Sequence, residues 1–213
     1  QLLWWEFPHE HWHDLRHGCP MNFLEPPASG VVLNSAMTTE QRGTAIDFVE
    51  ELCQLGVLQP ADPNELLTNC PLFMLPKAGQ PGEWRVLADM KKGGQNKVVG
   101  RDPVFLNRPS TVLPQLYSGG WSAVGDASKC FYQFPTAEVD RPYLGVIHPG
   151  TGQLYRYCGL PMGGANSPAV AGRIGGSLIR LCRESYPMLF DGVGRTNTWY
   201  DRFQLGRFDP KLG

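Results

Sequence analysis

The chain has 213 residues and a formal net charge of -1, with 19 Lys and Arg against 20 Asp and Glu. Hydrophobic residues make up 42% and charged residues 18%, which excludes a disordered chain and one that binds nucleic acid through global basicity. The sequence contains no apolar run long enough to predict a membrane span. The six cysteines include no C-x-x-C pair, which favours reduced thiols in an intracellular, reducing compartment.

The first 36 residues are rich in aromatic side chains, histidine and proline, and their pattern favours irregular structure. They contain His9-Glu10-His11-Trp12-His13, the H-E-x-x-H pattern that on a helix binds zinc in metallopeptidases. The longer form of that pattern has glycine where this chain has Arg16. We therefore expect a surface segment that docks on the region of residues 37–121 in preference to a zinc peptidase, with incidental metal binding left open.

The strongest predicted helix begins after residue 37. Thr38 is a candidate N-cap, and Gln41 three residues later completes a capping-box pattern. Gly56 is a natural stop. One apolar stripe with three- to four-residue spacing predicts the buried face: Ala45, Ile46, Val49, Leu52, Cys53 and Leu55.

Short strand-like runs follow at residues 71–75, 84–90, 121–126, 143–148 and 153–158. The last two are separated by Pro149-Gly150-Thr151-Gly152, which predicts a hairpin. A glycine-rich turn at 159–166 leads to a second predicted helix, with Ser167 as its cap and Pro168 at its first position. The buried stripe of that helix is predicted to consist of Val170, Ile174, Leu178 and Leu181.

Three stretches carry residues suited to phosphate chemistry. The run at 121–126 ends in Asp126, where a carboxylate on a rigid strand end could bind a metal ion. The two earlier runs and the Gly/Pro turn between them would form one flap that carries Lys77 and Arg85, and two cations there could hold a triphosphate. Each residue also has a plain structural interpretation: a turn aspartate and solvated surface cations.

The order of these motifs resembles the fingers and palm of reverse transcriptases, especially those of retroelements. The resemblance covers about residues 36–182 and rests on P-x-F-x-x-x-K at 71–77, W-R-x-x-x-D at 84–89, D-x-x-x-x-[FY] at 126–131 and L-P-x-G-x-x-x-[SA]-P-A at 160–169. It implies an α+β fold, a right-hand polymerase fingers–palm fragment with an antiparallel palm sheet packed on helices. The implied regions are an irregular segment at 1–36, fingers at 37–121, a partial palm at 122–185 and an irregular, truncated end at 186–213.

The resemblance also implies roles for single residues. Asp126 and the main-chain carbonyl of Ala127 would hold Mg²⁺, and Phe131 would reject a 2′-hydroxyl by its bulk. The incoming deoxynucleoside triphosphate would contact Lys77, Arg85, Met162 and Gly163. The implied reaction is two-metal phosphoryl transfer on an RNA or DNA template–primer.

The sequence departs from that family in one respect that bears on catalysis. The family supplies further carboxylates from an aromatic-x-Asp-Asp hairpin, and this chain has no Asp-Asp; Asp191 is a single, degenerate candidate. The alternative is therefore a catalytically inactive or domesticated module that binds nucleic acid or a protein partner.

Asp89 is interpreted as a structural hydrogen-bond acceptor at a strand end. A set of cations could either touch template phosphates or form a wet basic loop: Lys91, Lys92, Lys97, Arg101 and Arg108.

Overall fold

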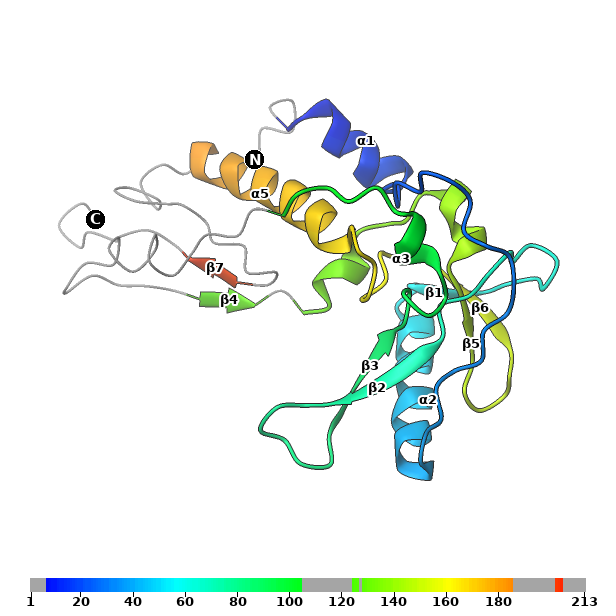
Figure 1. The fold of residues 1–213 in the computed structure, drawn as a ribbon. Helices are drawn as coiled ribbons and strands as arrows, with labels where there is room; N and C mark the ends of the chain where they lie inside the picture. Colours follow the sequence, from blue (N-terminus) through cyan, green and yellow to red (C-terminus); the bar gives the residue numbers. More distant parts are fainter. Residues whose placement is uncertain (1–6, 105–123, 127, 186–201, 205–213) are drawn as a thin grey trace. The chain divides into compact units, whose positions relative to one another are not determined.

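A computed structural model describes residues 7–104, 124–126, 128–185 and 202–204 (Figure 1). The chain divides into two compact units, and each is described here by itself. The first unit combines residues 14–102 with residues 131–167, and the second combines residues 1–13, 103–130 and 168–213. The described residues form both helices and antiparallel strands, which agrees with the α+β prediction.

Helix α2 (Thr39–Gln54) begins and ends where its sequence predicts. The Thr38 hydroxyl accepts a hydrogen bond from the Gln41 N–H, and the Gln41 side chain accepts one from the Thr38 N–H, which closes the capping box. At the other end Gly56 adopts a φ of 71°, and its N–H donates to the Cys53 carbonyl at 3.0 Å while that of Val57 donates to Leu52 at 2.9 Å. These two bonds make a Schellman motif, which satisfies the last carbonyls of the helix.

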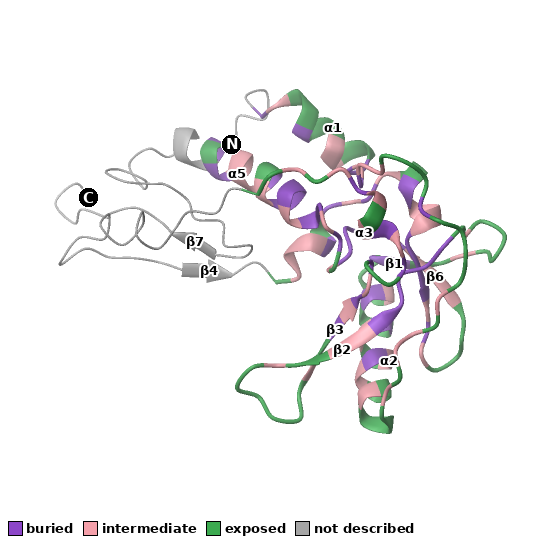
Figure 2. Ribbon diagram, in the orientation of Figure 1, coloured by how far each residue is buried: buried purple, intermediate pink, exposed green. Residues whose placement is uncertain are grey.

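The buried face of α2 is narrower than the predicted stripe. Ala45, Val49 and Leu52 are fully buried, whereas Leu55 is 57% exposed because it is the C-cap, where the chain leaves the helix. Helix α2 contacts strands β1 (Leu58–Pro60) and β3 (Trp84–Ala88). Figure 2 shows the buried residues of this unit where α2 meets the strands.

A three-stranded antiparallel sheet has the order β1-β6-β5, with β5 at Gly145–Ile147 and β6 at Leu154–Tyr157. The predicted hairpin between the last two is confirmed, since the His148 N–H donates to the Gln153 carbonyl at 2.8 Å. Strand β5 begins later than predicted because the preceding residues form a 3₁₀ helix, η4 (Glu138–Tyr143). Strand β1 pairs Leu58 with Tyr157, and both side chains are buried.

Strands β2 (Leu72–Pro76) and β3 form a separate antiparallel hairpin, which matches the two predicted runs. A short helix, α3 (Gln95–Val98), follows. The core of this unit draws on all of these elements, and its fully buried side chains include Met21, Leu52, Leu58, Leu72, Met90, Leu144, Tyr157 and Leu160. The Tyr132 and Tyr157 rings stack with centroids 6.3 Å apart.

The sequence pattern favours irregular structure before residue 37, but the structure has a helix there, α1 (His9–His17). Its polar sequence gives little apolar periodicity. Instead it is anchored by one buried side chain, His11, whose Nδ1 lies 2.8 Å from Ser177 Oγ of helix α5. Residues 7–13 and Ser177 belong to the same unit.

Helix α5 (Ser167–Ser185) corresponds to the second predicted helix. Ser167 is not its cap: it is already helical, and its hydroxyl donates to the Pro161 carbonyl at 2.9 Å. Val170, Ile174 and Leu181 are buried as predicted, whereas Leu178 is half-buried. The described part of the chain contains no helix long and apolar enough to cross a membrane.

Strand β4 (Val124–Asp126) pairs with β7 (Arg202–Gln204) in antiparallel register. This confirms that Asp126 ends a strand. The start of the predicted run, residues 121–123, lies outside the described residues.

Candidate functional site

The β2–β3 hairpin brings the two predicted phosphate-binding cations together. Leu75 pairs with Arg85, and the Lys77 N–H donates to the Glu83 carbonyl at 2.9 Å, so the ladder continues one step beyond the strands. Because side chains alternate along a strand, Lys77, Glu83 and Arg85 share one face of the hairpin. The opposite face carries Leu72, Val86 and Ala88, which are buried. The hairpin thus holds both cations on the face away from its buried side.

Lys77 already has a partner that the sequence analysis did not foresee. Its Nζ lies 2.7 Å from Glu83 Oε2, with the two side chains 40% and 53% exposed. The pair closes the base of the glycine-containing loop between the strands, and the Lys77 and Gln80 carbonyls accept further bonds there. The sequence signal is a Lys and a Glu at the two ends of a short Gly/Pro loop. Arg85 is exposed and forms no ion pair within the part of the chain described.

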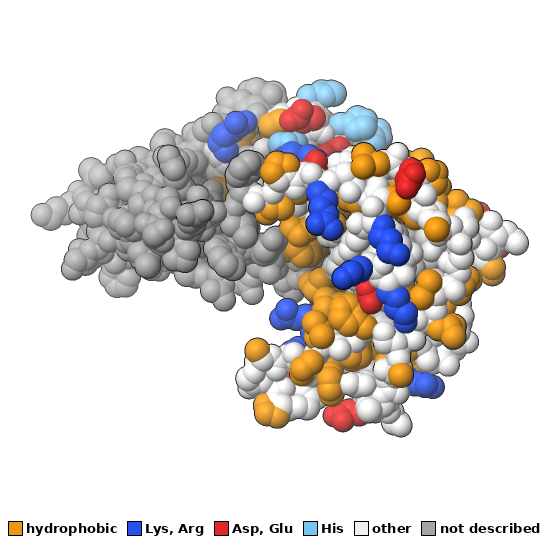
Figure 3. All heavy atoms as spheres, in the orientation of Figure 1, with side chains coloured by type: hydrophobic (Ala, Val, Ile, Leu, Met, Phe, Trp, Pro, Cys, Tyr) orange, Lys and Arg blue, Asp and Glu red, His pale blue; other side chains and the backbone are white. Residues whose placement is uncertain are grey.

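The segment after β3 carries exposed positive charge. Asp89 Oδ1 accepts a hydrogen bond from the Lys92 N–H at 2.9 Å, which confirms its structural role. Lys92 Nζ donates to the Leu33 carbonyl at 3.1 Å, which ties this segment to the extended chain at 31–35. Figure 3 shows Lys and Arg side chains gathered over α3 and the chain beside it. The exposed cations of this surface are Lys91, Lys92, Lys97 and Arg101.

The turn at residues 161–167 is held from two sides, beginning with Asn96 of α3. Asn96 Nδ2 donates to the Gly163 carbonyl and Asn96 Oδ1 accepts from the Ala165 N–H, both at 2.8 Å. The Ala88 N–H, at the end of β3, donates to the Met162 carbonyl at 3.2 Å. One amide side chain therefore fixes the middle of the turn, next to the strand that carries Arg85.

A second asparagine fixes the end of the same turn. Asn166 Nδ2 donates to the Gly100 carbonyl at 2.7 Å, and its Oδ1 accepts from the Asp102 N–H at 3.0 Å. Asn166 is almost completely buried, so both bonds replace water that the amide would otherwise bind. The family resemblance implies nucleotide contacts for Met162 and Gly163 in this stretch, whereas neither supporting asparagine was predicted from the sequence.

Gly163 is required by space as well as by conformation. Its φ is 128°, and a Cβ placed there would lie 2.1 Å from the Ala88 carbonyl oxygen. Its neighbour Gly164 faces Ser167 Oγ, Met21 and Met90, where a Cβ would also be too close. The turn thus packs its backbone directly onto the end of β3.

Burial shifts the pKa of ionisable groups near this turn. Burial raises the pKa of the Asp140 carboxyl, and the hydrogen bond from the Met21 N–H, 2.8 Å from Asp140 Oδ2, lowers it in part. Burial also raises the pKa of the Tyr157 hydroxyl, with Tyr132 and Cys70 adding to the shift. The Tyr157 hydroxyl therefore stays protonated at neutral pH and is not poised as a nucleophile.

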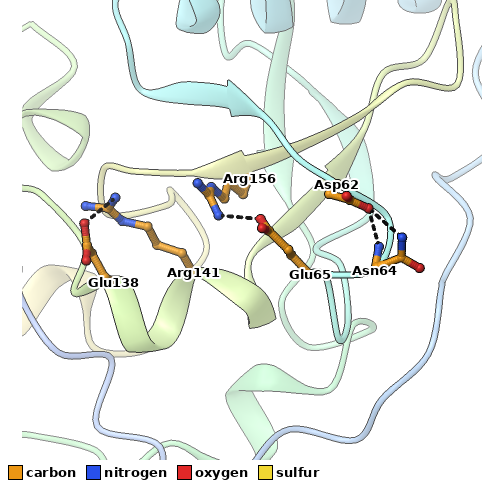
Figure 4. Close-up of polar contacts among 6 residues, drawn as sticks. All are labelled: Asp62, Asn64, Glu65, Glu138, Arg141 and Arg156. Carbon is orange, nitrogen blue, oxygen red and sulfur yellow. Dashed lines mark hydrogen bonds and ion pairs between the residues drawn. The ribbon is translucent and has the colours of Figure 1, made fainter.

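Two arginines near Cys158 form ion pairs with glutamates. Figure 4 shows Arg156 directed at Glu65 and Arg141 directed at Glu138, with Nη1 to carboxylate distances of 3.2 Å and 3.7 Å. Burial raises the pKa of the Cys158 thiol, and the two guanidinium groups offset only part of that shift. The thiol therefore stays protonated at neutral pH, and this cluster is structural.

The remaining predicted site residues lie in several places. Phe131 is half-buried in the 3₁₀ helix η3 (Cys130–Gln133), and its neighbour Tyr132 takes the core position instead. Ala127, Asp191 and Arg108 lie outside the described residues, and for Asp126 the structure describes the strand alone. Their roles remain predictions. Within the described ranges no group of three or more His, Cys, Asp or Glu side chains could hold a metal ion.

Comparison with known proteins relates the chain to retroviral polyproteins. No family model matches it. It is 30% identical over 158 residues to the Gag-Pro-Pol polyprotein of squirrel monkey retrovirus and 27% identical over 161 residues to that of simian retrovirus SRV-2. These matches cover 71% and 72% of the chain but only 8% of each polyprotein, so the chain spans a small part of these relatives.

A solved structure has a similar fold. A foamy viral protease–reverse transcriptase, in complex with double-stranded DNA, superposes with a TM-score of 0.68 over 91% of this chain and 31% of its own, at 18% identity. That identity supports the fold alone. The chain is thus similar to a segment of retroviral Gag-Pro-Pol polyproteins, and its mixed α+β fold is like that of part of a viral reverse transcriptase.

Proposed function

We propose that the chain is the fingers and first palm portion of an RNA-directed DNA polymerase of the retroelement type. The observation that carries this is the β2–β3 hairpin, which holds Lys77 and Arg85 on one face, with the braced turn at 161–167 against the end of β3. The similarity to Gag-Pro-Pol polyproteins and the reverse transcriptase-like fold support it. A polymerase of this type copies an RNA or DNA template from a primer and deoxynucleoside triphosphates.

In this proposal the hairpin binds the triphosphate. Arg85 is exposed and can form two parallel hydrogen bonds to phosphate oxygens. Lys77 contributes a second positive charge after it exchanges Glu83 for phosphate. That exchange costs little, since an exposed ion pair contributes about 0–1 kcal/mol. In this proposal Glu83 competes with the anion for Lys77, so a weakly charged anion would not displace it.

The backbone of the turn at 161–167 is proposed to line the far side of the nucleotide. Met162 and Gly163 would supply this wall, and Asn96 would hold it in place before the nucleotide arrives. A preformed wall loses little entropy on binding, which favours affinity. Phe131 is proposed to exclude a 2′-hydroxyl by its bulk.

Asp126 and the Ala127 carbonyl are proposed to hold Mg²⁺, for which hard oxygen ligands are suitable. When bound, two such ions would activate a primer hydroxyl and stabilise pyrophosphate as it leaves. Asp126 stands at a strand end, which suits the role of one ligand. A single carboxylate does not hold two divalent ions, and the chain has no Asp-Asp pair. A complete site therefore needs Asp191 or a carboxylate that this sequence does not contain.

A second candidate function, suggested by the exposed cations after β3, is a module that binds nucleic acid without catalysis. Both functions require the cationic surface formed by Lys91, Lys92, Lys97 and Arg101 to bind phosphates. We expect the 213-residue chain to bind a template–primer duplex with an affinity that falls as salt rises. Replacing Lys91 and Lys97 by Gln should lower the slope of log K against log salt by about 1 for each phosphate that is no longer neutralised.

Arg42 provides the matched control, because it is exposed and lies on α2, which carries none of these four cations. Fluorescence anisotropy over a salt series measures each slope. If Arg42→Gln weakens binding as much as Lys91→Gln and Lys97→Gln do, the binding is diffuse and the proposed surface is wrong.

Catalysis is tested on a longer protein that carries this chain together with the missing carboxylates. Primer extension with Mg²⁺ should be lost in Asp126→Asn and retained in Asp62→Asn, an exposed loop aspartate. Extension that survives Asp126→Asn would exclude the assigned metal ligand. Salt-dependent duplex binding without extension in the parent protein would favour the non-catalytic module.

A further inference from the structure

Residues 30–35 form an extended segment that runs beside the chain entering β2. At its start the Gly30 N–H donates to the Leu67 carbonyl, and at its end the Ser35 N–H donates to the Leu72 carbonyl, both at 2.9 Å. A parallel bridge at Gly30 gives the two chains the same direction. Both chains advance by the same number of residues between these contacts, which is expected where two extended chains run side by side.

One edge of this segment is fully engaged. The Val32 N–H donates to Asn69 Oδ1 at 2.7 Å, and the Val32 carbonyl accepts from Asn69 Nδ2 at 2.8 Å. Asn34 holds the next step, since its Nδ2 donates to the Ile147 carbonyl and its Oδ1 accepts from the Leu72 N–H, both at 2.9 Å. These bonds fix the backbone of the segment before any partner arrives.

The opposite edge is open. Successive residues of an extended chain direct their N–H and carbonyl groups to opposite edges, so Val31 and Leu33 direct theirs away from Asn69. Among the described residues these four backbone groups make one hydrogen bond, from Lys92 Nζ to the Leu33 carbonyl at 3.1 Å. The Val31 and Leu33 side chains share one face and are 70% and 74% exposed.

Charge beside the open edge favours one kind of partner. Lys91 and Lys92 are exposed, and the carboxylate on the same turn, Asp89, accepts from the Lys92 N–H. Pairing with a second copy of the chain would bring the Lys92 ammonium groups of both molecules to one shared edge, where they repel each other. A strand that carries carboxylates complements the charge instead.

We propose that residues 31–33 bind an extended acidic peptide segment of another protein, which pairs with the open edge as an additional strand. Backbone hydrogen bonds to Val31 and Leu33 provide affinity, and aliphatic side chains of the peptide pack on these two residues. A carboxylate of the peptide pairs with Lys92. This inference does not depend on the proposed polymerase function.

The test uses the 213-residue chain and a fluorescein-labelled peptide, Glu-Val-Glu-Val-Glu-Val, with binding followed by fluorescence anisotropy. Leu33→Pro removes an N–H of the open edge and retains both Val32 bonds, and it should weaken binding at least about tenfold. Lys92→Gln should weaken binding about threefold and reduce its salt dependence. The control is Val139→Ala, at a 76% exposed position on η4, which should change binding less than about twofold.

Two further measurements decide the matter if Leu33→Pro folds poorly, which thermal unfolding would reveal. Leu33→Ser keeps the backbone and removes the aliphatic side chain, and it should weaken binding about threefold to tenfold. Strand pairing uses the N–H groups of alternate peptide residues only. N-methylation of one series, either the valines or the glutamates, should therefore abolish binding, and N-methylation of the other should preserve it.

Three results would overturn the proposal. Equal losses on N-methylation of either series would exclude backbone pairing. Displacement of the peptide by oligothymidylate, with peptide affinity unchanged in Leu33→Ser, would identify a phosphate-binding surface instead. A dimer that forms without peptide and is lost in Leu33→Pro would show that a second copy of the chain occupies the edge.

Discussion

The turn at residues 161–167 and the hairpin tip at residues 77–83 both contain glycines, but glycine meets a different need in each. At Gly163 a Cβ would overlap the Ala88 carbonyl, so the position is closed by space and by its φ of 128°. At Gly79 φ is 74°, yet no atom lies within 4 Å of the position a Cβ would occupy. The first glycine allows close packing, and the second allows a bend.

The hydrogen bonds around the two segments differ in the same way. Asn96 and Asn166 tie the turn to α3 and to the chain at 100–102 through four bonds of 3.0 Å or less. The hairpin tip is closed by its own backbone and by the exposed Lys77–Glu83 pair. We infer that the turn is a rigid support and that the hairpin tip can change conformation at little cost.

The largest effect is expected at the close-packed glycine. Gly163→Ala adds an overlap to a strained backbone, and we expect a loss of about 3–5 kcal/mol in the free energy of unfolding. Gly79→Ala adds backbone strain alone, at about 1–2 kcal/mol. Urea unfolding measures both. Equal losses at the two positions would contradict the distinction between packing and bending.

The next largest loss of stability is expected when Asn96, which supports the turn, is replaced. Asn96→Ala leaves the Gly163 carbonyl and the Ala165 N–H without their partner, which should cost about 2 kcal/mol. Asn96→Asp should cost nearly as much, because its carboxylate still accepts from Ala165 but repels the Gly163 carbonyl. The matched control is Asn64→Ala in an exposed loop, expected to change stability by less than about 0.5 kcal/mol. Faster hydrogen exchange at the Ala165 amide in Asn96→Ala alone would support a local role.

The titration of Asp140 tests the packing beneath the same turn. Asp140 accepts a bond from Met21, whose side chain lies next to Gly164. Since burial raises the pKa of Asp140 above its usual 3.8, the folded state binds that proton more tightly than the unfolded state. Its contribution to stability is thus full below pH 3.8 and is lost as pH rises through the folded pKa.

Asp140→Asn removes this dependence and keeps an oxygen to accept from Met21. We expect its free energy of unfolding, relative to the wild type, to increase as pH is raised from about 4 to about 7. Urea unfolding at several pH values measures the difference. A difference that stays constant or decreases over that range would show that the charged carboxylate is accommodated without cost.

The smallest effect is expected at the hairpin tip. A double-mutant cycle with Lys77→Ala and Glu83→Ala should give a coupling energy of about 0.2–1 kcal/mol that declines with salt, as is usual for exposed pairs. A coupling above about 2 kcal/mol would mean that the tip is as rigid as the braced turn.

Local signals in the sequence predicted those parts of the fold that local contacts determine. The capping box at Thr38 and Gln41 and the stop at Gly56 placed α2, because each acts within four residues of a helix end. The two hairpins followed from alternating apolar runs separated by Gly/Pro turns. Ser167 was assigned as a cap because its sequence context fits one, but its hydroxyl instead bonds to Pro161 at the start of the turn.

Features that depend on distant residues could not be predicted in the same way. Strand β1 is three residues long and ends in proline, and its pairing with β6 joins residues nearly a hundred positions apart. The supporting roles of Asn96 and Asn166 depend on carbonyls and amides that only the fold brings near. For the candidate site, the presence of Lys77 and Arg85 on one hairpin was predictable from the sequence. The ion pair between Lys77 and Glu83 was not inferred.

Strand β1 has a consequence for how the protein behaves in concentrated solution. It is the terminal strand of its sheet in the described part of the chain, and Pro60 has no N–H to offer an incoming strand. A short border with a missing donor is a poor template for strand addition from a second molecule. Replacing Pro60 by valine would restore the N–H donor, so that the strands of other molecules could add to this edge of the sheet and start aggregation.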